Sequence, residues 1–348
     1  MTFPRTHALL AQGLEERAYP AVVCEVGRAH GPLWREALGH LCHDAQAPPC
    51  DESTIFDLAS LTKVIATTSL ILREVRTGAM AIDAPVRRYL PDWRDAGSDA
   101  VTIGHLLDHS SGLPAHRRFW ETSADAAALR RAVKAAPIER PVGASSVYSD
   151  VGLMLAGFAL EAVTGRSLDA QWASLWPTQS PWLGFNPPPT GWSKIAATEV
   201  DPWRGRTLQG EVHDENAAIL GGVAGHAGLF GAAEAVGVFA ATVLLSFRAE
   251  SWLATPALMR VFASRRQVPG SSRALGWDTM LPTSSCGTRL SATAIGHTGF
   301  TGTSLWIDWE QDLYVVLLTN RVHPARTNER FLPMRAQIHD AVVADLEG

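Results

Sequence analysis

A helical pattern that begins at Ser60 constrains the fold of this chain more than any other feature of the sequence. Apolar side chains recur at helical spacing from Leu61 to Val75, and Gly78 follows them as a stop signal. The pattern predicts a helix over residues 60–75. Ser60 would lie at its N-terminus, where the helix dipole favours developing negative charge.

Ser60 and Lys63 form an S-x-x-K pattern in the first turn of this helix. A three-residue offset places the hydroxyl and the amine on one face, within hydrogen-bonding reach. A serine is a poor nucleophile at its ordinary pKa, and a partly desolvated lysine beside it can take its proton or keep a neighbouring base ionised. Because the same pattern arises by chance in many helices, it indicates catalysis only together with other motifs.

Length and charge exclude several classes of function. The chain has 348 residues, of which 46% are hydrophobic, enough for one large core or two interleaved ones. The 30 Lys and Arg against 35 Asp and Glu give a net charge of -5, and no basic run could neutralise a phosphate backbone. The longest apolar stretches, residues 151–160 and 238–245, fall short of the roughly 20 residues that span a bilayer. We therefore expect a soluble protein with no nucleic-acid or membrane partner.

The N-terminal residues and the cysteines indicate the compartment. The first 17 residues lack the basic start, long apolar core and small-residue cleavage site of a signal peptide, so we expect a cytoplasmic protein. The four cysteines have neither CxxC spacing nor the density of a secreted disulfide scaffold. We expect reduced thiols at Cys24, Cys42, Cys50 and Cys286.

Strand patterns lie toward both ends of the chain. Residues 21–27 are rich in β-branched side chains, and residues 33–38 follow as a hairpin partner. Further strands are predicted at 274–280, 292–297, 303–308 and 313–319, the last three forming an antiparallel meander because their turns are short. Helices are predicted at 102–109, 124–135, 149–164, 233–247 and 328–346, with a Pro/Trp/Gly-rich stretch between 177 and 210.

Two more motifs follow the S-x-x-K pattern. Tyr148-Ser149-Asp150 occupies a loop that enters an apolar helix, and its alternative interpretation is an N-capping aspartate beside a core tyrosine. The segment His297-Thr298-Gly299-Phe300-Thr301-Gly302 ends a strand, where small residues let a substrate lie along the edge and place backbone N–H groups at an oxyanion. The alternative there is an ordinary glycine-rich hairpin.

Taken in this order, the three motifs resemble those of the class C β-lactamases and the related penicillin-binding-protein-like serine esterases and D-amino-acid peptidases. The resemblance extends from about Ser53 to Pro324. It is strengthened by Phe56-Asp57-Leu58-Ala59 before the serine, by residues 101–114, and by Leu317-Leu318-Thr319-Asn320.

The resemblance implies an α+β fold of the β-lactamase/transpeptidase type, an α/β sandwich in which helices flank an antiparallel sheet and a mostly helical domain is inserted. Residues 1–78 and 236–348 would form the sheet-and-helix domain, and residues 79–235 the helical domain with its long loops. The active site would lie in the crevice between them.

The resemblance also implies roles for individual residues. Ser60 would be the nucleophile, Lys63 its proton partner, and Tyr148 the base that activates the serine and later water. A phenol with a pKa near 10 becomes a usable base only where positive charge stabilises the phenolate, and Lys63 would supply that charge. No cofactor or metal is implied. The oxyanion hole would be the backbone N–H groups of Ser60 and Phe300, and the substrate site would include Asp150, His297, Thr298 and Gly299.

Two positions depart from the family's pattern. The third motif usually begins with lysine, whereas His297 is mostly neutral at pH 7 and holds a substrate carboxylate poorly. The second motif usually ends in asparagine, whereas an ionised Asp150 only accepts hydrogen bonds and favours a charged Lys63. We therefore expect feeble or absent β-lactam hydrolysis and a preference for esters, amides or small peptides.

A polar segment at residues 210–216, followed by a glycine-rich run at 221–228, resembles a loop found in a subgroup of these hydrolases. Either His213, Asp214 or Asn216 contacts substrate or orders the catalytic tyrosine, or the three form a hydrogen-bonded cluster that fixes a long loop.

His105 and His109 have a spacing that could bind a metal, but no Glu lies between them and no third ligand is evident. Helix-end hydrogen bonding is the favoured interpretation of both side chains.

We therefore expect a serine hydrolase that cleaves a small ester, amide or short peptide through an acyl-enzyme at Ser60, as an esterase or a D-amino-acid peptidase. One alternative is a penicillin-binding sensor that is acylated at Ser60 but does not turn over. Another is a scaffold that has kept the fold without the chemistry. The natural substrate and the oligomeric state do not follow from the sequence.

Overall fold

Strands from both ends of the chain form one antiparallel sheet of six strands, in the order β2-β1-β11-β10-β9-β8. Strands β1 (Ala21–Arg28) and β11 (Leu313–Thr319) come from opposite ends of the chain and pair antiparallel, with Val23 opposite Leu318. The computed structural model describes residues 1–44, 46–94 and 97–348. The other strands of the sheet are β2 (Gly31–Gly39), β10 (Ser304–Asp308), β9 (Ile295–Thr298) and β8 (Asp278–Thr279).

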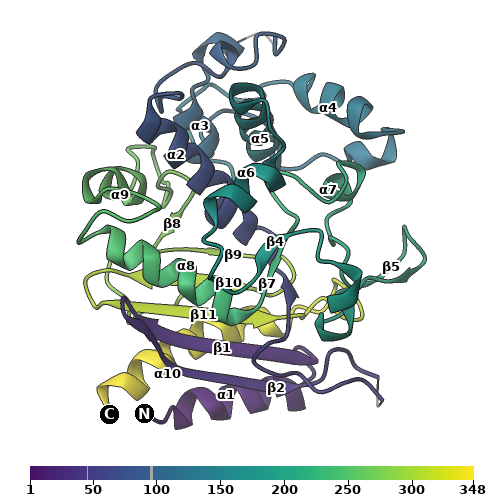
Figure 1. Cartoon of the computed structure of the whole chain (residues 1–348), viewed down its shortest axis with the longest axis vertical. Helices are drawn as coiled ribbons and strands as arrows, with labels where there is room; N and C mark the ends of the chain where they lie inside the picture. The colour runs from purple at the N-terminus through teal and green to yellow at the C-terminus, as the bar shows by residue number, and fades with distance from the viewer. Residues whose placement is uncertain (45, 95–96) are drawn as a thin grey trace.

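Both faces of this sheet are covered by helices. Figure 1 shows α1 (Pro4–Glu15) and α10 (Phe331–Glu347) beneath the sheet and α8 (Ala233–Ser246) above it, with the two chain ends close together. Alternate residues of β1 enter different cores, Val22 and Cys24 on one face and Val23 on the other. Covering both faces explains why these strands read as continuous apolar runs.

The rest of the chain lies beyond α8 and is mostly helical (Figure 1). One buried apolar cluster runs from the sheet residue Val23 through Leu70 to Leu155, so the division into domains at residues 78 and 236 stays a prediction. The helices are α2 (Ser69–Thr77), α3 (Ile103–Leu107), α4 (Ala126–Lys134), α5 (Asp150–Thr164), α6 (Leu168–Leu175), α7 (Glu215–Ile219) and α9 (Pro256–Ala263), with 3₁₀ turns at Val86–Arg88, Ser98–Ala100, Phe119–Glu121 and Pro189–Lys194. Short strands are β3 (Phe56–Asp57), β4 (Leu183–Phe185) and β7 (Leu229–Gly231) in one sheet, and β5 (Val200–Asp201) and β6 (Arg206–Thr207) in another.

The fold class and the meander of β9, β10 and β11 are confirmed. The predicted strand at 274–280 is wrong over most of its length, because only Asp278 and Thr279 pair. Gly276 has a φ of 84°, and a Cβ there would lie 2.0 Å from Thr68 Oγ1, so the chain turns instead of extending. The helices α6 and α9, of eight residues each, were not predicted, because so few residues give little periodicity.

The helix after Ser60 is present, but its first part is not an α-helix. Residues Lys63–Thr68 form a π-helix that continues into α2, and Gly78 ends it with a φ of 79°. The Thr68 hydroxyl donates to the Lys63 carbonyl at 2.7 Å, five residues earlier, and supports the wider turn. π-Helical turns inside helices are frequent at functional sites.

Candidate active site

Ser60 lies in a tight turn between β3 and the helix. Ala59, directly before it, has a φ of 47°, a left-handed conformation that a non-glycine residue adopts only when its surroundings hold it there. The Asp57 carboxylate accepts from the Ala59 backbone N–H at 2.8 Å and fixes this turn. The partly exposed Ser60 side chain therefore faces the cleft in one set position.

Lys63 is buried and has a partner for each of its three N–H donors. Its Nζ lies 2.8 Å from Ser60 Oγ, 2.8 Å from Asp150 Oδ1 and 2.9 Å from the His226 carbonyl oxygen. Burial is the largest single influence and favours the neutral amine, but the charges of Asp150 and Tyr148 and hydrogen bonds with both side chains together outweigh it and raise the pKa of Lys63. An ammonium with three acceptors has no lone pair for the serine proton. Lys63 is therefore a positive charge in this site.

Tyr148 lies against Lys63, whose Nζ is 5.0 Å from the centre of its ring. Burial raises the pKa of the Tyr148 phenol; Lys63 lowers it, the Asp150 charge opposes Lys63, and hydrogen bonds with Lys63 and Ser60 lower it again. Lys63 does lower the pKa of Tyr148, as the sequence predicts, but burial and the Asp150 charge act in the opposite direction. The resting phenol is neutral and must lose its proton to act as a base.

Asp150 contacts Lys63 and also lines the cleft. Burial would raise the pKa of its carboxyl, but the charge of Lys63 and a hydrogen bond from His116 hold it far below its usual range. His116 Nδ1 lies 3.4 Å from Asp150 Oδ2 on the partly exposed side. Ser149 is the N-cap of α5 and its hydroxyl accepts from the Gly152 N–H, so the cap is one residue before the predicted aspartate.

The turn after β9 is attached to the backbone just before Ser60. The Thr303 hydroxyl donates to the Leu58 carbonyl at 3.0 Å, and the Thr301 hydroxyl donates to the Asp57 carbonyl at 2.8 Å. A Cβ at Gly299 would lie 2.7 Å from the Leu58 carbonyl oxygen, so only glycine permits this approach. Among the described residues, no acceptor is paired with the backbone N–H groups of Ser60 and Phe300, as an oxyanion hole requires.

His297 and Arg273 lie on the far side of Tyr148. The ring centres of His297 and Tyr148 are 5.7 Å apart, and Arg273 Cζ lies 5.2 Å from the Tyr148 ring. Burial, followed by the charge of Arg273, holds the pKa of His297 well below its ordinary value. His297 is therefore neutral near pH 7, and the Arg273 cation beside it is paired with Asp278 at 3.9 Å.

The cleft measures about 640 Å³ and brings together the three motifs and part of the polar segment. His213 and Asp214 line it, whereas Asn216 is buried and bonds to the Arg117 carbonyl and the Trp120 N–H. Asn216 thus fixes a neighbouring loop. Predicted residues that line the cleft are Ser60, Tyr148, Asp150, His213, Asp214, His297, Thr298, Gly299 and Phe300.

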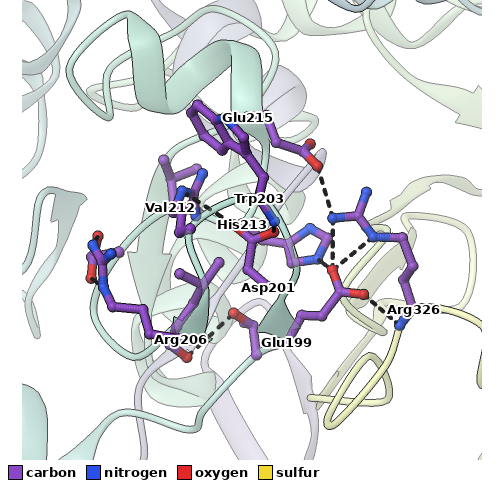
Figure 2. A network of polar contacts seen from close by, with 12 residues as sticks. Glu199, Asp201, Trp203, Arg206, Val212, His213, Glu215 and Arg326 are labelled. Carbon is purple, nitrogen blue, oxygen red and sulfur yellow. Dashed lines mark hydrogen bonds and ion pairs between the residues drawn. The ribbon is translucent and has the colours of Figure 1, made fainter. Parts of the chain in front are cut away.

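A network of polar contacts holds the polar segment in place. Figure 2 shows Glu199 between His213 and Arg326, with His213 Nε2 at 2.9 Å and Arg326 Nε at 2.7 Å from its carboxylate. Burial would raise the pKa of Glu199, but these hydrogen bonds lower it to about 2. Arg326 also contacts Glu215 at 2.8 Å, and the His213 ring stacks on Phe300 with centres 5.6 Å apart.

Asp214, in the same segment, makes two polar contacts. It caps α7 through the Ala217 N–H at 2.7 Å and also lies 2.9 Å from His226 Nε2. Burial would raise the pKa of Asp214, but His226 lowers it to about 2. The hydrogen-bonded cluster, one of the two alternatives from the sequence, is present, whereas contact of these side chains with substrate stays a prediction.

Sequence reasoning missed several side chains of the site: Arg273, His226, Glu199, Arg326 and His116. They lie in loops, and no periodic pattern marks them. His226 belongs to the glycine-rich run, where Gly225 packs against Gly157 and Leu153, so the closely spaced glycines were the available signal.

Other predictions concern metals, thiols and membranes. The His105 ring accepts from the Thr102 N–H at 3.1 Å, and the His109 ring accepts from the Ser149 N–H at 3.0 Å. Both histidines thus form the hydrogen bonds that were favoured over metal binding. Within the described residues, no group of three or more potential ligands could hold a metal ion, and all four cysteines are free. No single helix there is long and apolar enough to cross a membrane; α5 and α6 meet the length and composition test only as a pair bent by 74°.

Comparison with known proteins agrees with this geometry. The model of the Beta-lactamase family matches residues 6–337. A putative D-alanyl-D-alanine carboxypeptidase of Escherichia coli K12 is 32% identical over 78% of this chain and 70% of its own length. An N-acetylmuramyl-L-alanine amidase of Bacillus subtilis 168 is 33% identical over 78% of this chain and 68% of its own.

Solved structures show the same fold at lower identity. EstCE1, a hydrolase with promiscuous acyltransferase activity, is similar with a TM-score of 0.79 and 21% identity, covering 97% of each chain. The chain belongs to the Beta-lactamase family. Within that family it is a serine hydrolase.

Proposed function

We propose that this protein hydrolyses a small ester or amide, including short peptides, through a covalent acyl-enzyme at Ser60. The observation that carries the proposal is the 2.8 Å contact between Lys63 Nζ and Ser60 Oγ, beside a cleft that Ser60 and Phe300 line. The backbone N–H groups of Ser60 and Phe300 have no acceptor among the described residues. The similar carboxypeptidase and amidase both carry names of amide-cleaving enzymes, which supports an amide as substrate.

In the acylation step, the phenolate form of Tyr148 takes the Ser60 proton while Oγ forms a bond to the carbonyl carbon. The carbonyl oxygen becomes an oxyanion that the N–H groups of Ser60 and Phe300 would stabilise. The bond to the leaving group then breaks, and Tyr148 returns the proton to the departing nitrogen or oxygen. Lys63 remains an ammonium throughout and stabilises the phenolate.

Deacylation repeats the sequence with water. Tyr148 takes a proton from a water molecule, whose oxygen bonds to the acyl carbon, and the ester bond to Ser60 breaks. The proton then returns to Oγ. The cleft that Tyr148 lines, with a volume of about 640 Å³, would admit this water.

As substrate we propose an ester or a D-amino-acid amide in preference to a β-lactam. A neutral His297 at the start of the third motif offers no fixed charge to a carboxylate next to the scissile bond. The alternative of a sensor that is acylated without turnover is favoured only by the Asp150 carboxylate in place of an amide.

The test is parallel turnover of p-nitrophenyl acetate, p-nitrophenyl butyrate, D-alanyl p-nitroanilide and nitrocefin, with Ser60→Ala as the control. Steady turnover of an ester or the anilide, lost in Ser60→Ala, is the expected result. One equivalent of product without a steady state would support the sensor instead. Rates equal to those of Ser60→Ala on every substrate would contradict the hydrolase.

A further inference from the structure

Four arginines line the cleft, and they differ in how their charge is balanced. Arg326 pairs with Glu199 and Glu215 (Figure 2), and Arg273 lies 3.9 Å from Asp278. The other two, Arg321 and Arg335, form no ion pair with a described carboxylate, although both line the same cleft.

Arg335 lies in the second turn of α10 and is only 6% exposed. Its Nε is buried without a hydrogen-bond partner among the described residues, and its guanidinium carbon lies 5.0 Å from the Phe331 ring. Burial, helped by the charge of Arg321, lowers the pKa of Arg335 to about 10. The side chain thus remains a cation at neutral pH, without a counter-ion.

Arg321 follows β11 and is 4% exposed. Its Nη1 donates to the Asn328 carbonyl at 2.7 Å, but its Nε is also buried without a partner. Glu329 is the acidic residue whose charge acts on it, yet Glu329 is exposed and forms no ion pair with it. Arg321 Cζ lies 4.9 Å from the ring of Phe300, the residue whose N–H faces the oxyanion position.

Two buried guanidinium groups that repel each other are costly to a fold unless an anion accompanies them. Their planar donors match a carboxylate, which can accept two parallel hydrogen bonds. Since both groups line the substrate cleft, and Arg321 lies beside Phe300, the missing anion is best supplied by the substrate. The third motif offers no such cation, because His297 is neutral.

We propose that Arg335 and Arg321 form a subsite for a carboxylate of the substrate, remote from the scissile bond, so that the protein prefers acidic peptides or acyl groups that carry a carboxylate. The inference rests on the proposed acyl hydrolysis only in taking the bound carboxylate to belong to a substrate. The binding preference can be measured without any turnover.

The experiment uses the full-length Ser60→Ala protein and two pairs of probes measured by calorimetry. The pairs are L-alanyl-D-isoglutamine, whose free γ-carboxylate is remote from the peptide bond, with L-alanyl-D-glutamate diamide, and N-succinyl-D-alaninamide with N-succinamoyl-D-alaninamide. We expect the free carboxylate form of at least one pair to bind about tenfold more tightly than its amide. Adding Arg335→Gln should remove the difference, whereas Arg330→Gln, which removes an exposed arginine of the same region, should keep it.

Equal affinities of free and amidated probes in both pairs would overturn the subsite, and so would a preference that persists in Arg335→Gln. The first comparison needs no Arg335 variant, so poor folding of that variant cannot hide the answer. A second readout is Arg335→Met, which should melt no lower than the parent protein because it removes an unpaired buried charge. If Ser60→Ala prefers the carboxylate while the wild-type protein hydrolyses nothing, the proposed function fails and the subsite remains.

Discussion

At the scale of single residues, Asp150 is the substitution that changes the chemistry most. It takes the place of a neutral amide and puts a full negative charge 2.8 Å from Lys63 Nζ. That charge raises the pKa of Lys63 and, after burial, is a second influence that raises the pKa of Tyr148. The pKa values of Lys63 and Tyr148 are therefore raised together, although catalysis needs Lys63 protonated and Tyr148 deprotonated.

Asp150→Asn should move the pH profile of kcat/KM to lower pH. Removing the charge lowers the pKa of Tyr148, so the phenolate appears at lower pH, and lowers the pKa of Lys63, so the alkaline decline also begins earlier. We expect both limbs to move to lower pH. Rates on p-nitrophenyl butyrate between pH 6 and 11 measure this, and limbs that stay in place would contradict the account of the charge balance.

The proximity of these residues was predictable, but their balance was not. The three-residue offset of Ser60 and Lys63 on a helix dictates their contact whatever the fold around them. The resemblance to the family placed Tyr148 and Asp150 beside them. The pKa of Tyr148, however, depends on burial and on the sum of two opposite charges, which spacing in the sequence does not contain.

At the scale of elements, the β9–β10 turn and the Ser60 turn act as one unit. Gly299→Ala would force the turn away, because the new Cβ would lie 2.1 Å from Thr303 Oγ1 and 2.7 Å from the Leu58 carbonyl oxygen. We expect kcat to fall by about 10² to 10³, the effect of losing one oxyanion donor. Gly191→Ala is the matched control, since no atom lies within 4 Å of its Cβ position. An unchanged kcat in a folded Gly299→Ala protein would rule out the proposed oxyanion hole.

The network around Glu199 joins the polar segment to the loop before α10, and it should make stability depend on pH. The folded pKa of Glu199, about 2, lies below its unfolded value of about 4.3. The resulting stabilisation is complete above that unfolded value and is lost as pH falls toward 2. It amounts to at most about 3 kcal/mol.

Denaturant unfolding at pH 5, 4 and 3 measures this loss. Glu199→Gln should be less stable at pH 5 and should lose less stability on acidification than the wild type. Glu310→Gln removes an exposed carboxylate elsewhere and should behave as the wild type does. Parallel acid curves for wild type and Glu199→Gln would contradict the role of the network.

The element boundaries show where sequence patterns are informative. The strands β1 and β11 were found because long apolar runs mark them, and β11 ends where predicted. The strand predicted at 274–280 failed because Leu275 and Trp277 are buried in an irregular turn, which has the same apolar composition as a strand. Periodicity does not separate the two over so few residues.

At the scale of the whole molecule, the distribution of charge over the cleft defines the expected substrate. The third motif begins with a neutral histidine where the family has lysine. Two arginines that form no ion pair with a described carboxylate, Arg321 and Arg335, line the same cleft, with Arg321 beside Phe300. β-Lactams carry their carboxylate close to the scissile bond. Nitrocefin should therefore be turned over more slowly than about 10 per second, a typical enzyme rate, and a faster rate would contradict this assignment of charge.

The fold and the motif residues could be predicted from the sequence, whereas the arginine subsite could not. Arg321 and Arg335 lie 14 positions apart in the sequence on different elements, and nothing in their spacing indicates a shared cleft. Only the packing of α10 beneath the sheet brings them together. Whether a charge is paired is likewise a property of the folded chain alone.

The most direct test of the central claim is to trap the acyl-enzyme. Wild-type protein mixed with p-nitrophenyl acetate and quenched in acid within one turnover should gain the mass of one acetyl group, and peptide mapping should place it on Ser60. Ser60→Ala should gain none. An acetyl group on another residue, or steady turnover with no covalent adduct at any quench time, would contradict catalysis through Ser60.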